Sequence, residues 1–290
     1  MAGQAAALAA NGYTVASIPY DTHFFAALEN ERPDCVFNIA EGRRGKDRES
    51  IVPAICRSLD IPCTSSDAVG LGLSLDKDLC KHIAHAHGVP TPDWFVVRRI
   101  KALDSLALPF PLFVKPNFEG SSMGIRPDSI VRTAEQLRER VAWLLCKIGP
   151  ALVETYMPGP ELTVGLLGND DPIAFPVAEV RTAGRVYDKT MKNKDKMEEE
   201  IVCPAPIAPE SAGELVAWSK TLFHELGLAG MARFDFKCDA AGKPGFLEVN
   251  PLPGMSRYYS VFTFQAQAAS LTYEQLIGRI VELALERRRK

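Results

Sequence analysis

Two short apolar segments with polar side chains at alternate positions constrain this chain more than any other feature. They read ARFDFKC and GFLEVN. Successive side chains of a strand point to opposite faces, so Arg233 and Asp235 share one face while the two phenylalanines point into a core. By the same alternation, Glu248 and Asn250 share a face, opposite Leu247 and Val249. The segments therefore predict two strands, each with one polar and one apolar face.

A hairpin that joins these strands through a loop at residues 239–244 places Asp235 opposite Glu248. One polar cluster then lies on an otherwise apolar hairpin. Two carboxylates and the amide oxygen of Asn250 form a set of hard oxygen ligands, which suits Mg²⁺ with positions left for water and a substrate phosphate. A solvated hairpin face with surface ion pairs is an equally weighted alternative.

Two further segments have the residue types of a nucleotide site. Lys115 ends an apolar strand, and the EGSSMG loop that follows offers several backbone N–H groups to a polyphosphate. An ordinary hairpin turn is the alternative for that loop. The VETYMPGPE segment combines a strand, whose backbone groups suit an adenine edge, with Glu161, whose carboxylate suits ribose hydroxyls. Taken alone, this segment is also typical of an interdomain hinge.

The composition is that of a globular protein that binds small molecules. Of the 290 residues, 47% are hydrophobic, and the formal net charge is −3. Basic residues form no block before the last four positions, which argues against a nucleic-acid partner. No apolar run approaches the roughly 18 residues of a membrane span. The seven cysteines are scattered without a C-x-x-C pair, which predicts reduced thiols and a cytoplasmic protein.

The order of the expected elements divides the chain. The first third alternates apolar strands with helices, which predicts a parallel α/β sheet. Its strands are expected at residues 14–18, 35–39 and 61–64. The remainder reads as two α+β units, and we expect three domains at residues 1–92, 93–157 and 158–290, the first of them lacking its leading strand.

The joint order of these segments resembles the ATP-grasp superfamily, and in particular the D-alanine–D-alanine ligase family. The resemblance also covers the LDKD segment and the GVPTP segment upstream, and it extends over about residues 13–270. It implies a three-domain ATP-grasp fold, α/β followed by α+β. It also implies ATP and Mg²⁺, or alternatively Mn²⁺, as cofactors. Such ligases phosphorylate a carboxylate with ATP, and an amine then attacks the acyl phosphate.

The resemblance assigns roles to residues of this sequence. For the nucleotide, it implies phosphate contacts for Lys77 and Lys115, an adenine pocket of Glu154, Tyr156 and Met157, a ribose contact for Glu161, and Lys192 on a closing loop. For the metal and the reacting groups, it implies metal ligation by Asp235, Glu248 and Asn250, charge stabilisation by Arg233 and the Gly254 backbone, and an amine-side role for Ser121.

Several departures concern the amino-acid substrates. The family begins with a strand and a loop whose glutamate grips the first ammonium, whereas this chain starts at the following helix. Either the N-terminus is truncated or the sheet is one strand smaller. Glu41 stands where the family has a histidine, Asn193 stands where the closing loop has a tyrosine, and the expected carboxylate-binding serine falls at Tyr259, with Ser260 one residue late. We hypothesise that Glu41 recognises the ammonium; an ion pair with a neighbouring arginine is the alternative.

The expected function is formation of a D-alanyl-D-alanine-type dipeptide for peptidoglycan, with release of ADP and phosphate. A ligase of the same fold that joins other amino acids or small carboxylates is the first alternative. A nucleotide-binding protein without ligase turnover is the second. The expected partners are small amino acids, without nucleic acid or membrane, and a homodimer is left open.

Overall fold

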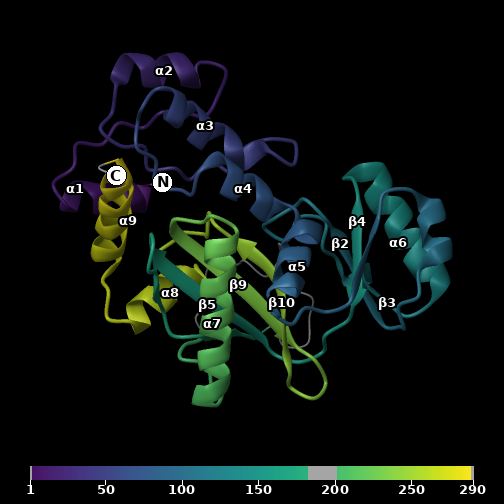
Figure 1. Ribbon diagram of the computed structural model, residues 1–290. Coiled ribbons are helices and arrows are strands. Elements are labelled where there is room, and N and C mark those ends of the chain that lie inside the picture. The colour runs from purple at the N-terminus through teal and green to yellow at the C-terminus, as the bar shows by residue number, and fades with distance from the viewer. Residues whose placement is uncertain (1, 182–200, 289–290) are drawn as a thin grey trace.

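Two antiparallel sheets, flanked by helices, organise the chain (Figure 1). The structure is a computed structural model that describes residues 2–181 and 201–288. The helices are α1 (Ala2–Ala10), α2 (Phe24–Glu31), α3 (Ile51–Ser58), α4 (Ala68–Leu75), α5 (Lys77–Ala86), α6 (Ala134–Lys147), α7 (Pro209–Glu225), α8 (Val261–Ala268) and α9 (Tyr273–Arg288). The strands are β1 (Trp94–Val97), β2 (Leu112–Pro116), β3 (Ile130–Val131), β4 (Ala151–Thr155), β5 (Glu161–Gly168), β6 (Ile173–Ala174), β7 (Ala178–Val180), β8 (Ile201–Val202), β9 (Gly230–Cys238) and β10 (Pro244–Asn250).

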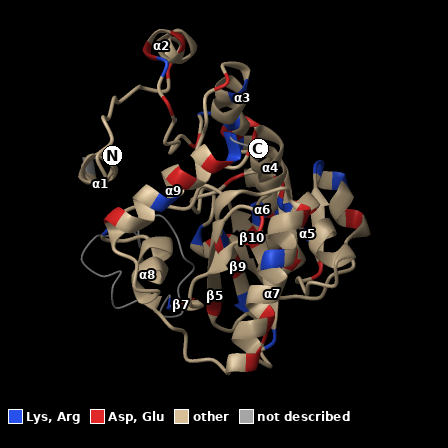
Figure 2. Cartoon of the chain, turned by 60° about the vertical axis from the view of Figure 1, so that its left-hand side comes forward, with Lys and Arg blue, Asp and Glu red and all other residues tan. Residues whose placement is uncertain are grey.

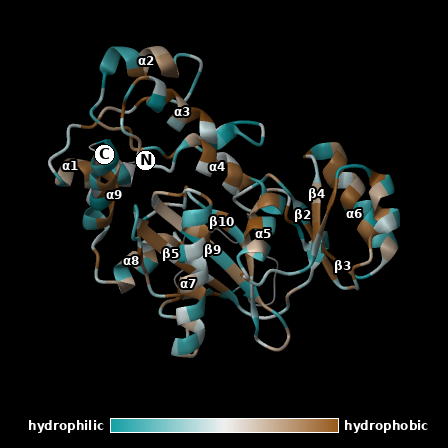
Figure 3. Cartoon of the chain, in the orientation of Figure 1, coloured by the Kyte–Doolittle hydropathy of each residue, from teal (hydrophilic) through white to brown (hydrophobic). Residues whose placement is uncertain are grey.

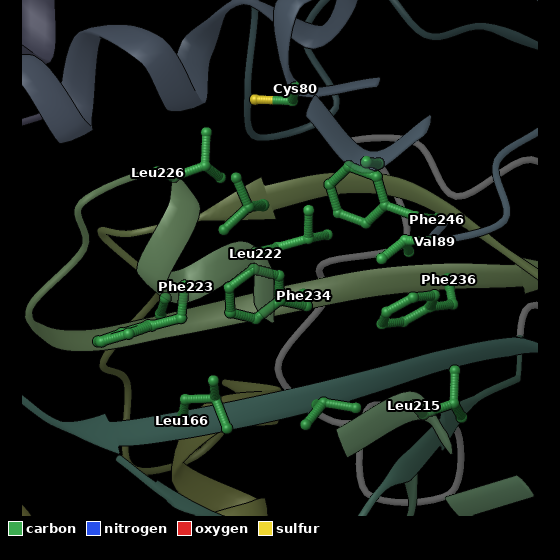
Figure 4. Close-up of a cluster of buried hydrophobic side chains, with 14 of the residues drawn as sticks. Cys80, Val89, Leu166, Leu215, Leu222, Phe223, Leu226, Phe234, Phe236 and Phe246 are labelled. Atoms are coloured by element: carbon green, nitrogen blue, oxygen red, sulfur yellow. The ribbon is translucent and has the colours of Figure 1, made fainter. Parts of the chain in front are cut away.

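The larger sheet has six strands in the order β10-β9-β5-β7-β8, with β6 paired to β5. Its apolar face packs against α7, and Figure 4 shows Phe234, Phe236 and Phe246 of the sheet beside Leu222 and Phe223 of the helix. All five side chains are fully buried. Burial of this much aromatic surface is a main source of stability here, since each such side chain contributes about 1.5–3 kcal/mol. The opposite face packs against α8 and α9.

The hairpin of β9 and β10 contains a bulge at Leu247. Phe246 pairs with Phe236, and the next paired residue of β10 is Glu248, opposite Asp235. The predicted placement of Asp235 opposite Glu248 is therefore confirmed. The expectation that Leu247 faces the core is wrong, because the extra residue of a bulge loses its partner and re-aims its side chain, which here lines a cavity.

The smaller sheet has four strands in the order β1-β4-β2-β3. Its apolar face packs against α6, a helix that starts at Ala134 after Thr133, whose hydroxyl caps the Gln136 N–H. Figure 3 shows the resulting pattern, with brown apolar strands inside and teal polar positions on the surrounding helices. The strand expected at 94–97 has those bounds, and both sheets are antiparallel.

The prediction of strands in the first third of the chain is wrong. Within the described residues, the segments at 35–39 and 61–64 meet in a single parallel bridge between Val36 and Cys63, and the segment at 14–18 pairs with no strand. Ile18, Val36 and Ile61 of these segments instead pack with Leu28 and Val52 in a small cluster. A strand needs a hydrogen-bonded neighbour, and the segment at 14–18 has none in the described chain. Its apolar residues therefore reflect packing and not a sheet.

Two helices near the ends of the described chain pack against each other. Ala7 and Leu8 of α1 lie in the same buried cluster as Leu276 and Ile280 of α9. Helix α9 carries charges of both signs on its outer surface (Figure 2). In the described ranges, no helix combines the length and apolar character needed to cross a membrane.

Candidate active site

A cavity of about 300 Å³ lies between the two sheets, a size typical of small-ligand sites. The structure brings most of the expected site residues to its wall. Those that line it are Glu41, Lys115, Ser121, Glu154, Tyr156, Met157, Glu161, Arg233, Asp235, Glu248, Asn250 and Gly254. Lys77 lines a smaller neighbouring cavity instead. Lys192 and Asn193 lie outside the described residues.

The smaller sheet contributes a buried ion pair triad. The Glu154 carboxylate of β4 lies between two ammonium groups, with Oε1 2.7 Å from Lys115 Nζ of β2 and Oε2 2.9 Å from Lys81 Nζ of α5. Burial opposes the ionisation of Glu154, but the two lysines outweigh it and lower its pKa. Burial lowers the pKa of Lys81 to about 8, with Glu154 opposing the shift. The glutamate is thus held ionised and fixed at the cavity wall.

The larger sheet contributes a network around Asp235 of β9. Arg233 donates to both of its carboxylate oxygens, with Nε at 2.8 Å and Nη2 at 2.7 Å. Thr163 Oγ1 of β5 and Asn250 Nδ2 of β10 donate to it as well, each at 2.8 Å. A carboxylate has about four acceptor positions, so this one is saturated. A metal ion bound to Asp235 would have to replace at least one of these four hydrogen bonds.

Glu248 of β10 connects this network to α5. Its Oε2 lies 3.3 Å from the Nζ of Lys77, which also donates to the backbone carbonyl of Glu119. Burial opposes ionisation of Glu248, but Lys77 and then Lys115 outweigh it and lower its pKa to about 2. The side chain is a carboxylate throughout the physiological range and faces both cavities.

Glu161 lies at the start of β5, beside the linker that joins the sheets. Burial raises its pKa, while Lys237, whose Nζ lies 3.7 Å from Oε2, acts in the opposite direction. The linker residues Tyr156 and Met157 line the same part of the cavity. This end of the cavity thus combines one carboxylate and the Lys237 ammonium with the two linker side chains.

The loop that follows β2 approaches the first third of the chain. Ser121 has a φ of 52°, an uncommon left-handed conformation, and its Oγ donates to Glu41 at 3.3 Å. The expected alternative, an ion pair of Glu41 with an adjacent arginine, is not among the ion pairs of the described residues. On the opposite wall, the Ser260 hydroxyl donates to the carbonyl of Gly254.

Sequence reasoning missed Lys81. The available signal was its position one turn after Lys77, on the helix face that also carries the buried Cys80 and Ala84. A lysine on an apolar helix face needs a buried anion. The sequence offered no way to identify that anion as Glu154, which lies 73 positions away in the chain.

Comparisons with known proteins agree with this architecture. A family model described as D-ala D-ala ligase C-terminus matches residues 83–282. The D-alanine–D-alanine ligase of Carboxydothermus hydrogenoformans is 31% identical over 98% of this chain and 92% of its own length. That of Pelotomaculum thermopropionicum is 33% identical over 97% of this chain and 89% of its own length.

A solved structure shows the same fold. The crystal structure of D-alanine–D-alanine ligase from Bacillus anthracis has a TM-score of 0.80 and 26% identity, and the match covers 99% of this chain and 92% of that one. The expected ATP-grasp fold is confirmed. The chain belongs to the D-alanine–D-alanine ligase family of ATP-grasp ligases.

Proposed function

We propose that this protein is an ATP- and Mg²⁺-dependent ligase that forms a D-alanyl-D-alanine-type dipeptide. One observation carries the proposal beyond family membership: Lys115, which is paired with Glu154, faces the same cavity as the Arg233, Asp235, Glu248 and Asn250 cluster. A triphosphate between them would meet positive charge on one side and a metal site on the other. Charge arranged in advance around the reacting groups is the usual source of rate in such transfers.

We assign the nucleotide to the cavity end near the linker. The backbone of residues 154–157 would bind the adenine edge, with Tyr156 and Met157 against the ring and Glu161 on the ribose. The phosphates would then reach Lys115 and Lys77. Lys192, on the segment outside the described residues, is assigned to the phosphates as well.

Asp235, Glu248 and Asn250 fit a magnesium ion by donor chemistry. Two carboxylates and an amide supply hard oxygen ligands, and the lowered pKa of Glu248 keeps it ionised. Manganese accepts the same donors. When bound, the ion would neutralise charge on the transferred phosphoryl group. Arg233 lines the same cavity and would offer its guanidinium to a phosphate group there.

The proposed reaction has two steps. A carboxylate oxygen of the first amino acid attacks the γ-phosphorus of ATP, and ADP leaves. The neutral amine of the second amino acid attacks the acyl carbon, loses one proton, and expels inorganic phosphate. Arg233 and the backbone at Gly254 would stabilise the acyl phosphate and the tetrahedral oxyanion. Ser121 and Glu41 would form the cavity wall beside the amino-acid substrates. The dipeptide product would be used in peptidoglycan synthesis.

A second candidate is a ligase of the same kind that joins other amino acids or small carboxylates. It is favoured by the wall that would meet the second substrate, where Tyr259 stands at the serine position and Ser260 already donates to Gly254. We place the enzyme in the cytoplasm, which is supported by seven free cysteines.

Phosphate release from ATP, measured across a panel of D- and L-amino acids, tests the proposal. Stimulation by D-alanine is the expected result. Stimulation by another amino acid alone would support the second candidate. ATP binding without stimulation by any amino acid would overturn both.

A further inference from the structure

A second, smaller cavity adjoins the main one. Its wall combines Glu41 and Glu49 from the first third of the chain, Lys77 from α5, and Glu248 and Asn250 from β10. Glu41, Glu248 and Asn250 line both cavities, so the two communicate beside the expected metal site. A molecule in the smaller cavity would therefore lie next to the phosphoryl-transfer end of the larger one.

The charges around the smaller cavity do not balance. Lys77 is paired with Glu248, with 3.3 Å between Nζ and Oε2. Arg48, the other nearby cation, is paired with Glu119, with 3.1 Å between Nη2 and Oε2. Both cations thus already have a carboxylate partner. The carboxylate of Glu49 forms an ion pair with neither of these two cations.

Glu49 is the unusual member of this group. The residue is 7% exposed, so more than nine-tenths of it is buried, and in the described ranges no hydrogen bond or ion pair reaches its carboxylate. Burial raises its pKa to about 7, with Arg48 opposing the shift and Glu41 adding to it. A buried carboxyl without a partner is costly. A ligand with a positive charge would remove that cost.

We propose that Glu49 binds the ammonium group of the amino acid whose carboxylate is phosphorylated. This inference rests on the proposed function and names the substrate of the same site. Glu41, the candidate from the sequence, is exposed, and its oxygens accept from Ser121. Glu49 is buried, so water competes less with a charge-assisted contact to its carboxylate.

The size of the cavity limits which part of a substrate it can hold. It measures about 30 Å³, roughly twice the space that a single water-sized group requires. An ammonium group fits this space, and the rest of the amino acid would extend into the larger cavity, which shares Glu248 and Asn250 with this one.

Formation of a hydroxamate tests the inference, because hydroxylamine replaces the second amino acid and traps the acyl phosphate of the first. We expect Glu49→Gln to raise the KM for D-alanine by roughly ten- to a hundredfold, and to leave the KM for ATP within about twofold. Asp47→Asn removes the same charge from an exposed position of the same segment and serves as the matched control, with an unchanged KM.

A second measurement separates ammonium binding from a structural disturbance. Propionate has the carboxylate and carbon chain of alanine without the ammonium, so we expect its inhibition constant against D-alanine to be equal in wild type and Glu49→Gln. A parallel loss of propionate and D-alanine binding would overturn the inference. So would an unchanged KM in Glu49→Gln, or a KM raised only by Glu41→Gln. A wild-type enzyme silent with every amino acid would instead refute the proposed function itself.

Discussion

The ammonium of Lys81 lies 2.9 Å from the carboxylate of Glu154, although neither side chain is exposed by more than 2%. Lys81 also donates to the hydroxyl of Thr91 and to the backbone carbonyl of Phe246. These partners come from β4, from the segment before β1 and from β10. One buried cation therefore ties the smaller sheet, which carries Lys115, to the larger sheet, which carries the expected metal ligands.

Replacement of Lys81 by Met should destabilise the fold strongly. The change leaves Glu154 with Lys115 alone and removes the donor to Thr91 and to the carbonyl of Phe246, and loss of a partner from a buried ion pair costs up to about 3–5 kcal/mol. Urea denaturation gives the free energy of unfolding, with the exposed Lys101→Met as the control, expected within about 0.5 kcal/mol of wild type. Equal stability of the two variants would show that Glu154 does not depend on Lys81.

Glu49 should make the stability fall as the pH rises. Its folded-state pKa of about 7 lies above the unfolded value of 4.5, so the folded protein binds more protons between these values. The stabilising effect is complete below pH 4.5 and is lost as the pH rises through 7. The charged groups around it are Arg48, Lys77, Glu41 and Glu119. Thermal unfolding should show that the stability of Glu49→Gln relative to wild type increases from pH 5 to pH 8. A stability difference that is the same at both pH values would contradict this.

Glu248→Gln should reduce turnover by at least roughly a hundredfold, because it removes one of the two carboxylates among the expected metal ligands. The fold should change little, since a glutamine can still accept a hydrogen bond from Lys77. Phosphate release at saturating ATP over a range of Mg²⁺ concentrations measures the effect. The exposed Glu139→Gln is the control. A Glu248→Gln enzyme with wild-type turnover would contradict the assignment of the metal site.

Lys115→Ala should weaken ATP binding by at least roughly tenfold, about 1.4 kcal/mol. The lysine acts as a point charge for phosphate, and its loss also leaves Glu154 with a single cation. Calorimetric titration with ATP measures the dissociation constant, and circular dichroism checks the fold. Wild-type affinity in a folded variant would support the plain hairpin turn weighed for this segment.

Local sequence patterns predicted elements that have a continuous apolar face or segment. The strand Trp94–Val97 and the helix Tyr273–Arg288 have the expected bounds. The segment at 14–18 has a strand-like pattern without a strand partner. Pattern alone does not show whether an apolar segment pairs in a sheet or only packs.

In the candidate site, too, some features could be predicted from local sequence and others depend on the fold. Family motifs named the polar residues of β9 and β10, and the structure gathers them at one cavity. They did not reveal the bulge at Leu247, which sets the register between Glu248 and Asp235. Lys81 was missed because its buried partner Glu154 is distant in sequence, and Glu49 was missed because its burial is a property of the fold.

Oxygen transfer tests the acyl-phosphate reaction most directly. D-alanine labelled with ¹⁸O in its carboxylate is incubated with ATP, Mg²⁺ and the enzyme, and the released phosphate is analysed by mass spectrometry together with the peptide product. If the carboxylate attacks the γ-phosphorus and phosphate later leaves with that oxygen, each phosphate carries one ¹⁸O and appears with one dipeptide. Phosphate without ¹⁸O, released without dipeptide, would contradict a ligase that works through an acyl phosphate.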